Sequence, residues 1–434
     1  MIAREALLAA GHREVGEDEA ELHVVNTCCI TSEAEAKSRQ SVRRSLRAAR
    51  RVYASGCAVN LSARRFADLG DEVVALQGAA DDVARRIAAH AGSGAVDHAG
   101  GGPAAHVAPW IPAHAVSGST SCADTAHDVL ARERLAGAGP LSRTRGFVKI
   151  QDGCDSGCAY CIIPTVRGGA RSRPASAVLR EVAQRVRDGQ PEMVMTGISV
   201  GDYRDPEQGM ELGDLMRAVA RVPGIERVRL SSVEVIHVRD SLLEALVSEP
   251  KVCPHLHVPL QSGDDAVLAA MGRHYTAAEY VERIARVRAA VPRLNVTTDV
   301  IVGFPTEDEA AFERTLRALD AACITRVHVF PYSPRPGTVA AGLGDAVAPA
   351  DKRRRGQAMR AHSELSSRRH RSSRLGLRER VLVDKVAATR CSGYTADYVR
   401  CYLPPGAARR GELVDVVCED LQADGIRCRP LRRR

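Results

Sequence analysis

The sequence has no long hydrophobic run and few aromatic residues, and both absences narrow its function. No apolar stretch approaches the roughly 18 residues that a membrane-spanning helix needs. The first residues, MIAREALLAAGHREV, are typical of an amphipathic helix and lack the apolar core and cleavage site of a secretory signal. We therefore expect a cytoplasmic protein. Aromatic residues make up only 3% of the chain, which argues against a base-stacking RNA-binding sheet.

Positive charge is concentrated in one stretch. The chain has a formal net charge of +8, and residues 351–380 hold eleven Lys or Arg against three Asp or Glu, an excess of the same size. Such a stretch suits an anionic partner, and it equally suits a solvated helix face. The charge pattern alone leaves both interpretations open.

The sequence contains thirteen cysteines, an odd number that argues against a closed disulfide framework. In a reducing compartment, cysteines serve more often as metal ligands, catalytic groups or small buried apolar residues. The scattered cysteines lack ligand spacing, and we interpret them as ordinary or buried thiols: Cys122, Cys253, Cys323, Cys391, Cys401, Cys418 and Cys428.

Four regions follow one another along the 434 residues. Residues 1–90 alternate helix and strand, and two of the strands end at Cys28-Cys29 and at Cys57. Residues 91–140 are rich in Gly, Ala, His and Ser, which predicts a flexible linker or insertion. Residues 141–372 repeat strand and helix about six times and end in a basic helical stretch, which predicts an α/β fold with a closed or partly closed parallel sheet. Residues 373–434 predict a small β-barrel.

The segment GFVKIQDGCDSGCAYCIIP contains the most informative motif, Cys-x₃-Cys-x₂-Cys at Cys154, Cys158 and Cys161. Three thiolates can hold a [4Fe–4S] cluster and leave one iron without a protein ligand. S-adenosyl-L-methionine (SAM) can chelate that iron and be cleaved to a radical. A structural zinc site usually needs four ligands in pairs, and no nearby fourth ligand has suitable spacing. Three buried cysteines are improbable in such a polar, glycine-flanked loop.

With these motifs the chain resembles the methylthiotransferase family of radical SAM enzymes over nearly its full length. The resemblance rests on VVNTCCIT, ASGCAVN, DGCDSGCAYCIIP, HVPLQSGDD, TDVIVGFPTE and HVFPYSPRPGT. It implies an N-terminal auxiliary-cluster domain, a partial (β/α)6 TIM-like radical SAM barrel and a C-terminal TRAM-like RNA-binding β-barrel. The motifs are most similar to the branch that adds a methylthio group to C2 of N6-threonylcarbamoyladenosine beside the tRNA anticodon.

The resemblance also implies cofactors and partners. One SAM donates a methyl group and another forms the radical, and a low-potential donor such as flavodoxin or ferredoxin supplies the electron. A second [4Fe–4S] cluster is expected at Cys28 and Cys57 with a third cysteine before the first helix, which this sequence lacks. We expect the domain to begin upstream of Met1. Cys29 is either a substitute ligand or a bystander.

Several other residues are candidates for binding. Polar or small residues at predicted strand ends are candidates for SAM, although each could instead satisfy backbone groups: Tyr160, Thr196, Gly197, Ser232, Glu234, Gln261 and Gly303. Four basic residues are candidates for tRNA phosphates: Lys352, Arg353, Arg354 and Arg355. Arg171 and Arg173 could bind the SAM carboxylate or a phosphate. His255 and His257 share one strand face, and we interpret them as structural.

Three other functions remain open at this stage. The same chemistry could act on another tRNA adenosine, isopentenyladenosine, or on a ribosomal-protein aspartate. A noncatalytic RNA-binding protein with a structural metal is the alternative of a different class, and it predicts no SAM cleavage.

Overall fold

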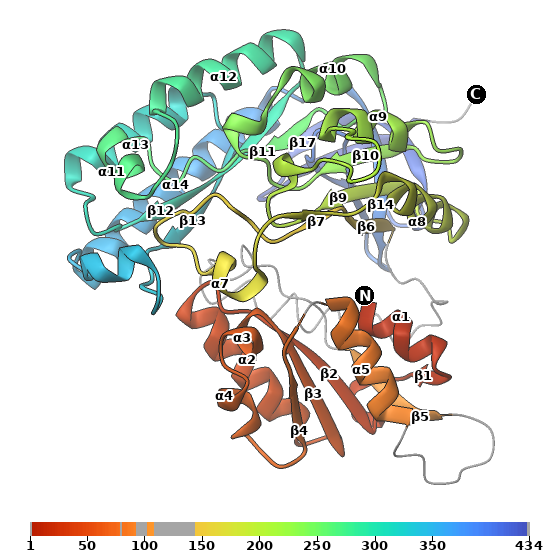
Figure 1. Ribbon diagram of the computed structural model, residues 1–434. Coiled ribbons are helices and arrows are strands. Elements are labelled where there is room, and N and C mark those ends of the chain that lie inside the picture. Colours follow the sequence, from red (N-terminus) through yellow and green to blue (C-terminus); the bar gives the residue numbers. More distant parts are fainter. Residues whose placement is uncertain (1, 79, 93–101, 108–143, 432–434) are drawn as a thin grey trace. The chain divides into compact units, whose positions relative to one another are not determined.

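The computed structural model describes residues 2–78, 80–92, 102–107 and 144–431 (Figure 1). The chain forms two compact units, and each is discontinuous in sequence. Unit 1 comprises Met1–Gly137 together with two later segments, Tyr160–Gly169 and Ser333–Ala341. Unit 2 comprises Ala138–Ala159, Ala170–Tyr332 and Gly342–Arg434.

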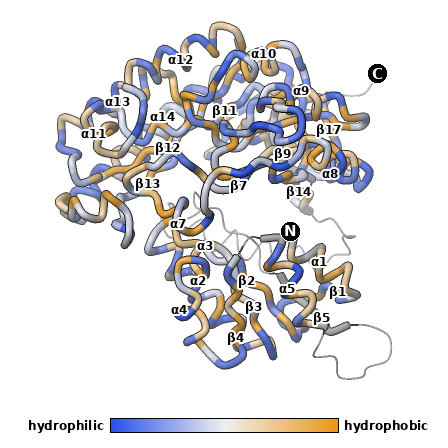
Figure 2. The backbone as a smooth tube through the Cα atoms, viewed as in Figure 1, coloured by the Kyte–Doolittle hydropathy of each residue, from blue (hydrophilic) through white to orange (hydrophobic). Residues whose placement is uncertain are grey.

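Unit 1 is built on a parallel sheet of five strands in the order β1-β5-β2-β3-β4. Its strands are β1 (His12–Glu14), β2 (Leu22–Thr27), β3 (Arg51–Gly56), β4 (Val73–Leu76) and β5 (Gly102–Val107). Its helices are α1 (Ile2–Ala9), α2 (Ser32–Ser45), α3 (Cys57–Leu61), α4 (Arg64–Ala67), α5 (Ala80–Gly92) and α7 (Ile163–Arg167). Apolar side chains of β2 and β3 lie in the core, and both strands carry hydrophobic colouring in Figure 2.

Strand β5 corrects one prediction. Its residues, Gly102–Val107, lie inside the stretch predicted as a linker, and they pair with β1 on one side and β2 on the other. The sequence GPAAHV carries little strand signal, and the ladder on both sides supplies the hydrogen bonds that stabilise it. Residues 91–92 of the predicted linker are the end of helix α5. Residues 93–101 and 108–140 lie outside the described part of the chain, as does Cys122.

Unit 2 contains six parallel strands that follow each other in sequence order, with helices between them. Two three-stranded sheets, β6-β9-β10 and β11-β12-β13, are joined by parallel bridges from Val228 to Val252 and from Ser232 to His257. The strands are β6 (Arg145–Lys149), β9 (Glu192–Thr196), β10 (Arg227–Leu230), β11 (His255–His257), β12 (Asn295–Val302) and β13 (Arg326–Pro331). This arrangement confirms the predicted partial (β/α)6 barrel.

The intervening helices pack apolar faces on the sheets. They are α8 (Ala175–Arg187), α9 (Leu212–Ala220), α10 (Asp240–Ser248), α11 (Asp265–Ala270), α12 (Ala277–Ala290), α13 (Glu309–Ala321) and α14 (Pro349–Ser372). Helix α12 begins at a capping box in which Thr276 and Glu279 bond each other's backbone N–H groups. In the described part of the chain, no helix has both the length and the hydropathy of a membrane span.

The C-terminal region forms the predicted small barrel. Its five strands close in the order β14-β15-β16-β18-β17. They are β14 (Arg378–Val386), β15 (Cys391–Tyr394), β16 (Arg400–Leu403), β17 (Leu413–Leu421) and β18 (Ile426–Pro430). Buried arginines of the parallel strands donate to the barrel's backbone: Arg227 to Tyr394 at 2.9 Å and Arg229 to Ala396 at 2.9 Å. The small barrel is thereby fixed to the amino ends of the parallel strands.

Candidate active site

The cysteine loop begins where β6 ends, and one buried glutamine anchors it. The Gln151 side chain is 1% exposed and donates to the carbonyl of Gly153 at 2.8 Å. Its Oε1 accepts from the backbone N–H groups of Ile198 and Ser199, just after β9. Gly197 is required here because a Cβ would lie 2.8 Å from the carbonyl oxygen of Gln151. The loop is therefore tied to the carboxyl ends of two strands.

Within the loop, short-range hydrogen bonds orient the first cysteine. The Sγ of Cys154 accepts from the backbone N–H of Ser156 at 3.4 Å, and the Asp155 carboxylate accepts from the N–H of Ala170 at 3.2 Å. Cys154 and Cys158 are half-buried members of unit 2. Cys161 lies on the Tyr160–Gly169 segment of unit 1, where its Sγ accepts from the N–H of Ile163 at 3.4 Å.

Cys158 lies on the wall of a cavity of about 470 Å³ in unit 2. This volume falls in the range of small-molecule sites. The walls come from the cysteine loop and from the segments after β9, β10 and α11: Asp155, Ser156, Cys158, Ala170, Asp202, Glu234, Ile236, His237, Gly272, Arg273 and His274. The cysteine loop and the segments after β9 and β10 follow the carboxyl ends of strands, where α/β barrels bind their ligands.

Arg273 is the cation closest to the cysteine loop in this cavity. Its Nη1 donates to the Sγ of Cys158 at 3.2 Å and to Oε1 of Glu234 at 3.0 Å, and its side chain is 3% exposed. This guanidinium group therefore ties the Cys158 side chain to the carboxylate of Glu234. Arg273 was missed by the sequence analysis because it follows α11, more than a hundred residues after Cys158, within no recognised motif.

A histidine–carboxylate pair forms another part of the cavity wall. The His237 Nε2 lies 3.0 Å from Oδ1 of Asp202. The hydrogen bond from His237 is the main cause that lowers the pKa of Asp202, so this carboxylate stays ionised. The cavity therefore presents cationic and anionic groups together, as a zwitterionic ligand requires.

The structure places the predicted SAM residues in different surroundings. Glu234 lines the cavity, and Thr196 is half-buried at the end of β9. Ser232 takes part in the backbone bridge to His257, and Tyr160 is a half-buried residue of unit 1. Gln261 has a φ of +67°, a strained conformation for a residue with a side chain, and such strain concentrates at functional sites.

Gly303 requires a correction. We predicted that its small size lets the backbone approach SAM, but a Cβ there would lie 2.4 Å from Cγ of Lys352. The stem of Lys352 fills that space, and the Gly303 N–H donates to Glu307 at 2.7 Å. This glycine is explained by packing against α14.

The basic run at the start of α14, residues 352–355, was predicted to bind tRNA phosphates, but two of its four side chains are buried. Lys352 and Arg355 are 8% and 6% exposed; Lys352 pairs with Asp345, and Arg355 pairs with Glu307 at 2.7 Å. Both are occupied inside unit 2, so they cannot hold phosphates. Arg354 is half exposed but bonded to Glu309 at 2.6 Å. Arg353 is the exposed member of the run that forms no ion pair with the described residues.

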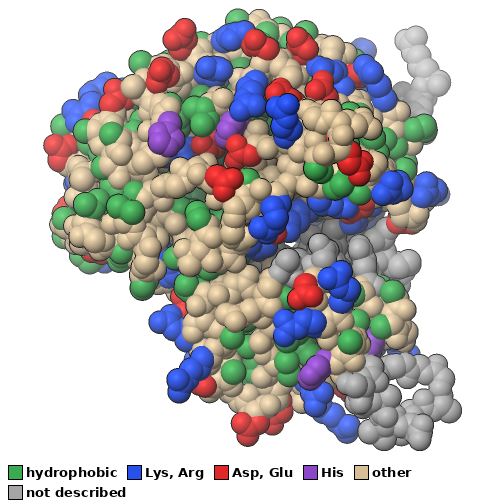
Figure 3. Space-filling view, viewed as in Figure 1, with side chains coloured by type: hydrophobic (Ala, Val, Ile, Leu, Met, Phe, Trp, Pro, Cys, Tyr) green, Lys and Arg blue, Asp and Glu red, His purple; other side chains and the backbone are tan. Residues whose placement is uncertain are grey.

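Other basic candidates are also engaged in structural contacts. Arg173 donates to Glu181 at 2.7 Å and to the carbonyl of Lys149 at 2.6 Å. On the face drawn in Figure 3, positive and negative side chains are interspersed over both units. His257 lies between Thr297, at 2.8 Å, and Asp299, at 3.1 Å, in agreement with a structural role.

The cysteines of unit 1 form a second centre. Cys28 and Cys29 follow β2, Cys57 follows β3, and Cys29 and Cys57 are buried. A hydrogen bond with Cys57, together with burial, raises the pKa of Cys29. Burial likewise raises the pKa of Cys28. The three cysteines therefore meet at the carboxyl ends of neighbouring strands, as their sequence positions predict.

Two arginines from the later segments of unit 1 reach this second centre. Arg167 of α7 donates from Nε to the Sγ of Cys57 at 3.1 Å. Arg335 donates to the carbonyl of Cys29 and pairs with Glu35 at 3.0 Å, and it is 4% exposed. Their charges oppose the effect of burial on Cys28. A buried site with thiols and two guanidinium groups suits an anionic thiolate-bound cluster.

Comparison with known proteins identifies two family matches in the chain. Residues 148–319 match the radical SAM superfamily, and residues 1–78 match the Uncharacterized protein family UPF0004. A radical SAM methyltransferase, TsrM, from Kitasatospora setae has a similar fold, with a TM-score of 0.50 and 14% identity over 71% of this chain and 62% of that one.

The relatives that match this chain include several tRNA methylthiotransferases. The threonylcarbamoyladenosine tRNA methylthiotransferase MtaB of Thermotoga maritima is 32% identical over 97% of this chain and 91% of its own. MtaB of Bacillus subtilis is 34% identical over 76% of this chain and 69% of its own. A tRNA-2-methylthio-N(6)-dimethylallyladenosine synthase of Alkalilimnicola ehrlichii is 41% identical over 56% of each chain. The chain belongs to the methylthiotransferase family of radical SAM enzymes.

Proposed function

We propose that this protein is a tRNA methylthiotransferase that replaces the hydrogen on C2 of N6-threonylcarbamoyladenosine with a methylthio group. The main support is the position of Cys158, a member of the Cys-x₃-Cys-x₂-Cys motif, on the wall of a ligand-sized cavity beside Arg273 and Glu234. The full-length similarity to MtaB proteins supports this choice of adenosine over isopentenyladenosine.

The residues present suit the cofactors that this function needs. Cys154, Cys158 and Cys161 would hold a [4Fe–4S] cluster, because three thiolates are the ligand set that leaves one iron open. The cavity would take SAM, since its mixed charges complement an amino acid moiety. With SAM bound, the cluster supplies the one-electron chemistry that an unreactive aromatic C–H bond requires. Flavodoxin or ferredoxin would supply the electron.

The protein's own side chains then have positioning roles. Arg273 holds Cys158 and Glu234 in place through one guanidinium group, so the loop and the segment after β10 share an anchor. Gln151 couples the loop to the segment after β9. These contacts hold together the segments that form the wall of the cavity.

The second centre would provide sulfur. Cys28 and Cys57 are the proposed ligands of an auxiliary [4Fe–4S] cluster, and Arg167 and Arg335 would offset its negative charge. The residue 373–434 barrel, as a TRAM-like domain, would bind tRNA together with Arg353. These assignments join a radical site, a sulfur site and an RNA site in one chain.

Anaerobic reconstitution with iron, sulfide, SAM and a reductant tests the proposal. We expect 5′-deoxyadenosine to form, and tRNA from a strain without methylthiotransferases to gain a methylthio group on threonylcarbamoyladenosine, detected by nucleoside mass spectrometry. Cys158→Ala should abolish both products, while Cys323→Ala, an exposed cysteine on unit 2, should leave both unchanged.

The two products distinguish the alternatives. 5′-Deoxyadenosine with modified isopentenyladenosine, or with a modified ribosomal-protein aspartate, would move the substrate assignment to another branch. Absence of 5′-deoxyadenosine from iron-loaded protein would leave the noncatalytic RNA-binding alternative.

A further inference from the structure

The interior of the C-terminal barrel is unusually rich in cysteine. Ten buried residues form its core: Val381, Val383, Cys391, Val399, Cys401, Leu403, Val416, Cys418, Ile426 and Cys428. Four of these ten are cysteines, whereas the whole chain has thirteen in 434 residues. Buried cysteines often pack as small apolar residues, so the arrangement of these sulfur atoms decides whether they can also bind a ligand.

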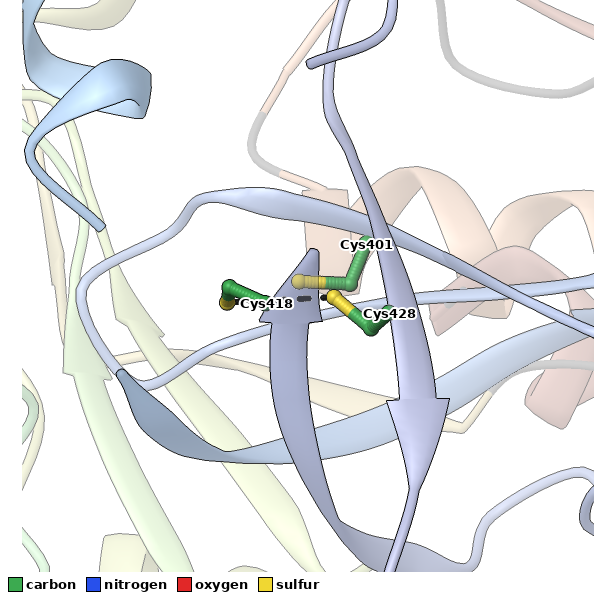
Figure 4. A group of neighbouring side chains, drawn as sticks. All are labelled: Cys401, Cys418 and Cys428. Atoms are coloured by element: carbon green, nitrogen blue, oxygen red, sulfur yellow. Dashed lines mark hydrogen bonds between the residues drawn. The ribbon is translucent and has the colours of Figure 1, made fainter. Parts of the chain in front are cut away.

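Three of these cysteines converge from three strands. Cys401 is on β16, Cys418 on β17 and Cys428 on β18, and their sulfur atoms all lie within 4.8 Å of one another (Figure 4). Cys418 and Cys428 are directly paired across the antiparallel ladder, with their sulfur atoms 3.8 Å apart. Each side chain is at most 1% exposed.

The spacing matches that of ligands on a single metal ion. Zinc–sulfur bonds of about 2.3 Å in tetrahedral geometry place neighbouring sulfur atoms about 3.8 Å apart. Soft thiolate ligands select Zn²⁺ and Cu(I) among the available metals.

We propose that Cys401, Cys418 and Cys428 bind one thiophilic d¹⁰ ion, Zn²⁺ or Cu(I), inside the barrel. Binding replaces the three S–H bonds with three metal–sulfur bonds, releases three protons to solvent and changes no oxidation state. The ion joins three of the five strands from within, and it is separate from both iron sites because its ligands belong to neither cysteine motif.

Metal analysis of the full-length chain tests this proposal. The background variant removes the proposed iron ligands by replacing five cysteines with Ala: Cys28, Cys57, Cys154, Cys158 and Cys161. Cells are grown with added zinc and copper, and both metals are measured in the purified protein. We expect about one equivalent of metal per chain, and the analysis shows whether the bound ion is zinc or copper.

Two variants in that background locate the metal. Cys418→Ser should lose it, whereas Cys391→Ser, in the same core but outside the sulfur cluster, should retain it. X-ray absorption of the background variant should show three sulfur neighbours at about 2.3 Å for zinc. This spectrum tests the site even if Cys418→Ser fails to fold.

Three results would overturn the proposal. The first is purified protein that contains no stoichiometric zinc or copper. In such protein the three thiols would react with an alkylating agent after unfolding even when no chelator is added, because no metal protects them. The second is metal that Cys418→Ser retains in a folded chain. The third is a disulfide between Cys418 and Cys428 in protein purified without air.

Discussion

Both ends of the parallel strands in unit 2 carry a pair of a buried arginine and a glutamate, but the surroundings of the two pairs differ. At the carboxyl end, Arg273 pairs with Glu234 and also contacts Cys158 on a cavity wall. At the amino end, Glu192 is 1% exposed and lies 3.1 Å from Arg229, whose guanidinium also bonds the backbone of the small barrel. The first pair faces a ligand site, and the second is sealed.

This difference shows that the surroundings decide what a buried ion pair does. A pair that is enclosed on all sides can only hold elements together, whereas a pair with one open side can also act on a ligand. Glu192 and Arg229 therefore hold the small barrel to the sheet, whereas Arg273 positions Cys158 of the cysteine loop. The following predictions separate stability from catalysis at the two ends.

The largest expected effect is on stability at the sealed end. Glu192→Gln leaves Arg227 and Arg229 without their carboxylate, and removing one partner of a buried pair costs about 3–5 kcal/mol in unfolding free energy. Denaturant unfolding of folded, iron-loaded protein measures this loss. The rate of SAM cleavage per folded molecule should stay the same. A lower rate would contradict the proposal that the Glu192 pair affects only stability.

The same pair predicts how stability depends on pH. Burial alone would raise the pKa of Glu192, but the charges of Arg229 and Arg145 outweigh burial and lower the pKa. The stabilisation is therefore present above the pKa of an unfolded glutamate and is lost as pH falls through the lower pKa of the folded state. In the Glu192→Gln variant, the free energy of unfolding should therefore fall less steeply as the pH is lowered into the acid range.

Arg273→Gln at the open end should chiefly affect catalysis. It removes a charged hydrogen bond of about 1.5–3 kcal/mol, which corresponds to roughly 10- to 150-fold slower 5′-deoxyadenosine formation at equal iron content. Arg273→Lys keeps the charge and should restore part of the rate. Arg286→Gln, an exposed residue paired with Asp240, is the control. A changed melting temperature with an unchanged rate would assign Arg273 a purely structural role.

A pair of glycines tests the anchoring of the cysteine loop. Gly197→Ala places a Cβ 2.8 Å from the backbone oxygen of Gln151, and such overpacking costs about 1–3 kcal/mol. It should displace the loop and slow SAM cleavage. Gly157 lies in the loop itself, with φ of +66° and open space around it, so Gly157→Ala should cost about 1–2 kcal/mol from backbone conformation alone. Equal effects of both variants on the rate would contradict the anchoring role of Gln151.

The smallest expected effect concerns tRNA. Arg353→Gln removes one exposed cation, so tRNA affinity should fall by less than about tenfold, and the slope of affinity against salt should decrease by about one. Binding measured by filter retention at several salt concentrations gives this slope. An unchanged slope would remove Arg353 from the RNA-binding surface.

The sequence predicts those features whose residues are close together along the chain. The Cys154–Cys161 motif and the strand–helix repeats are local patterns, and the structure contains the six strands and the small barrel that they predict. Arg273 and Gln151 act through contacts with distant segments, so no local pattern reveals them. The four basic residues at 352–355 were treated as equivalent, but helical geometry turns Lys352 and Arg355 inward with Met359. Their carboxylate partners come from other segments.

The division of unit 1 into three stretches of chain has a consequence for biosynthesis. Arg335 reaches back across 300 positions to Glu35, and Asn60 of α3 bonds the backbone of Val166. A ribosome therefore releases β2 and β3 long before the residues that complete their cysteine pocket. The first-made region must wait, only partly assembled, while most of unit 2 is translated. The cluster proposed at Cys28 and Cys57 would therefore gain its neighbour Arg335 only after residue 335 has been synthesised.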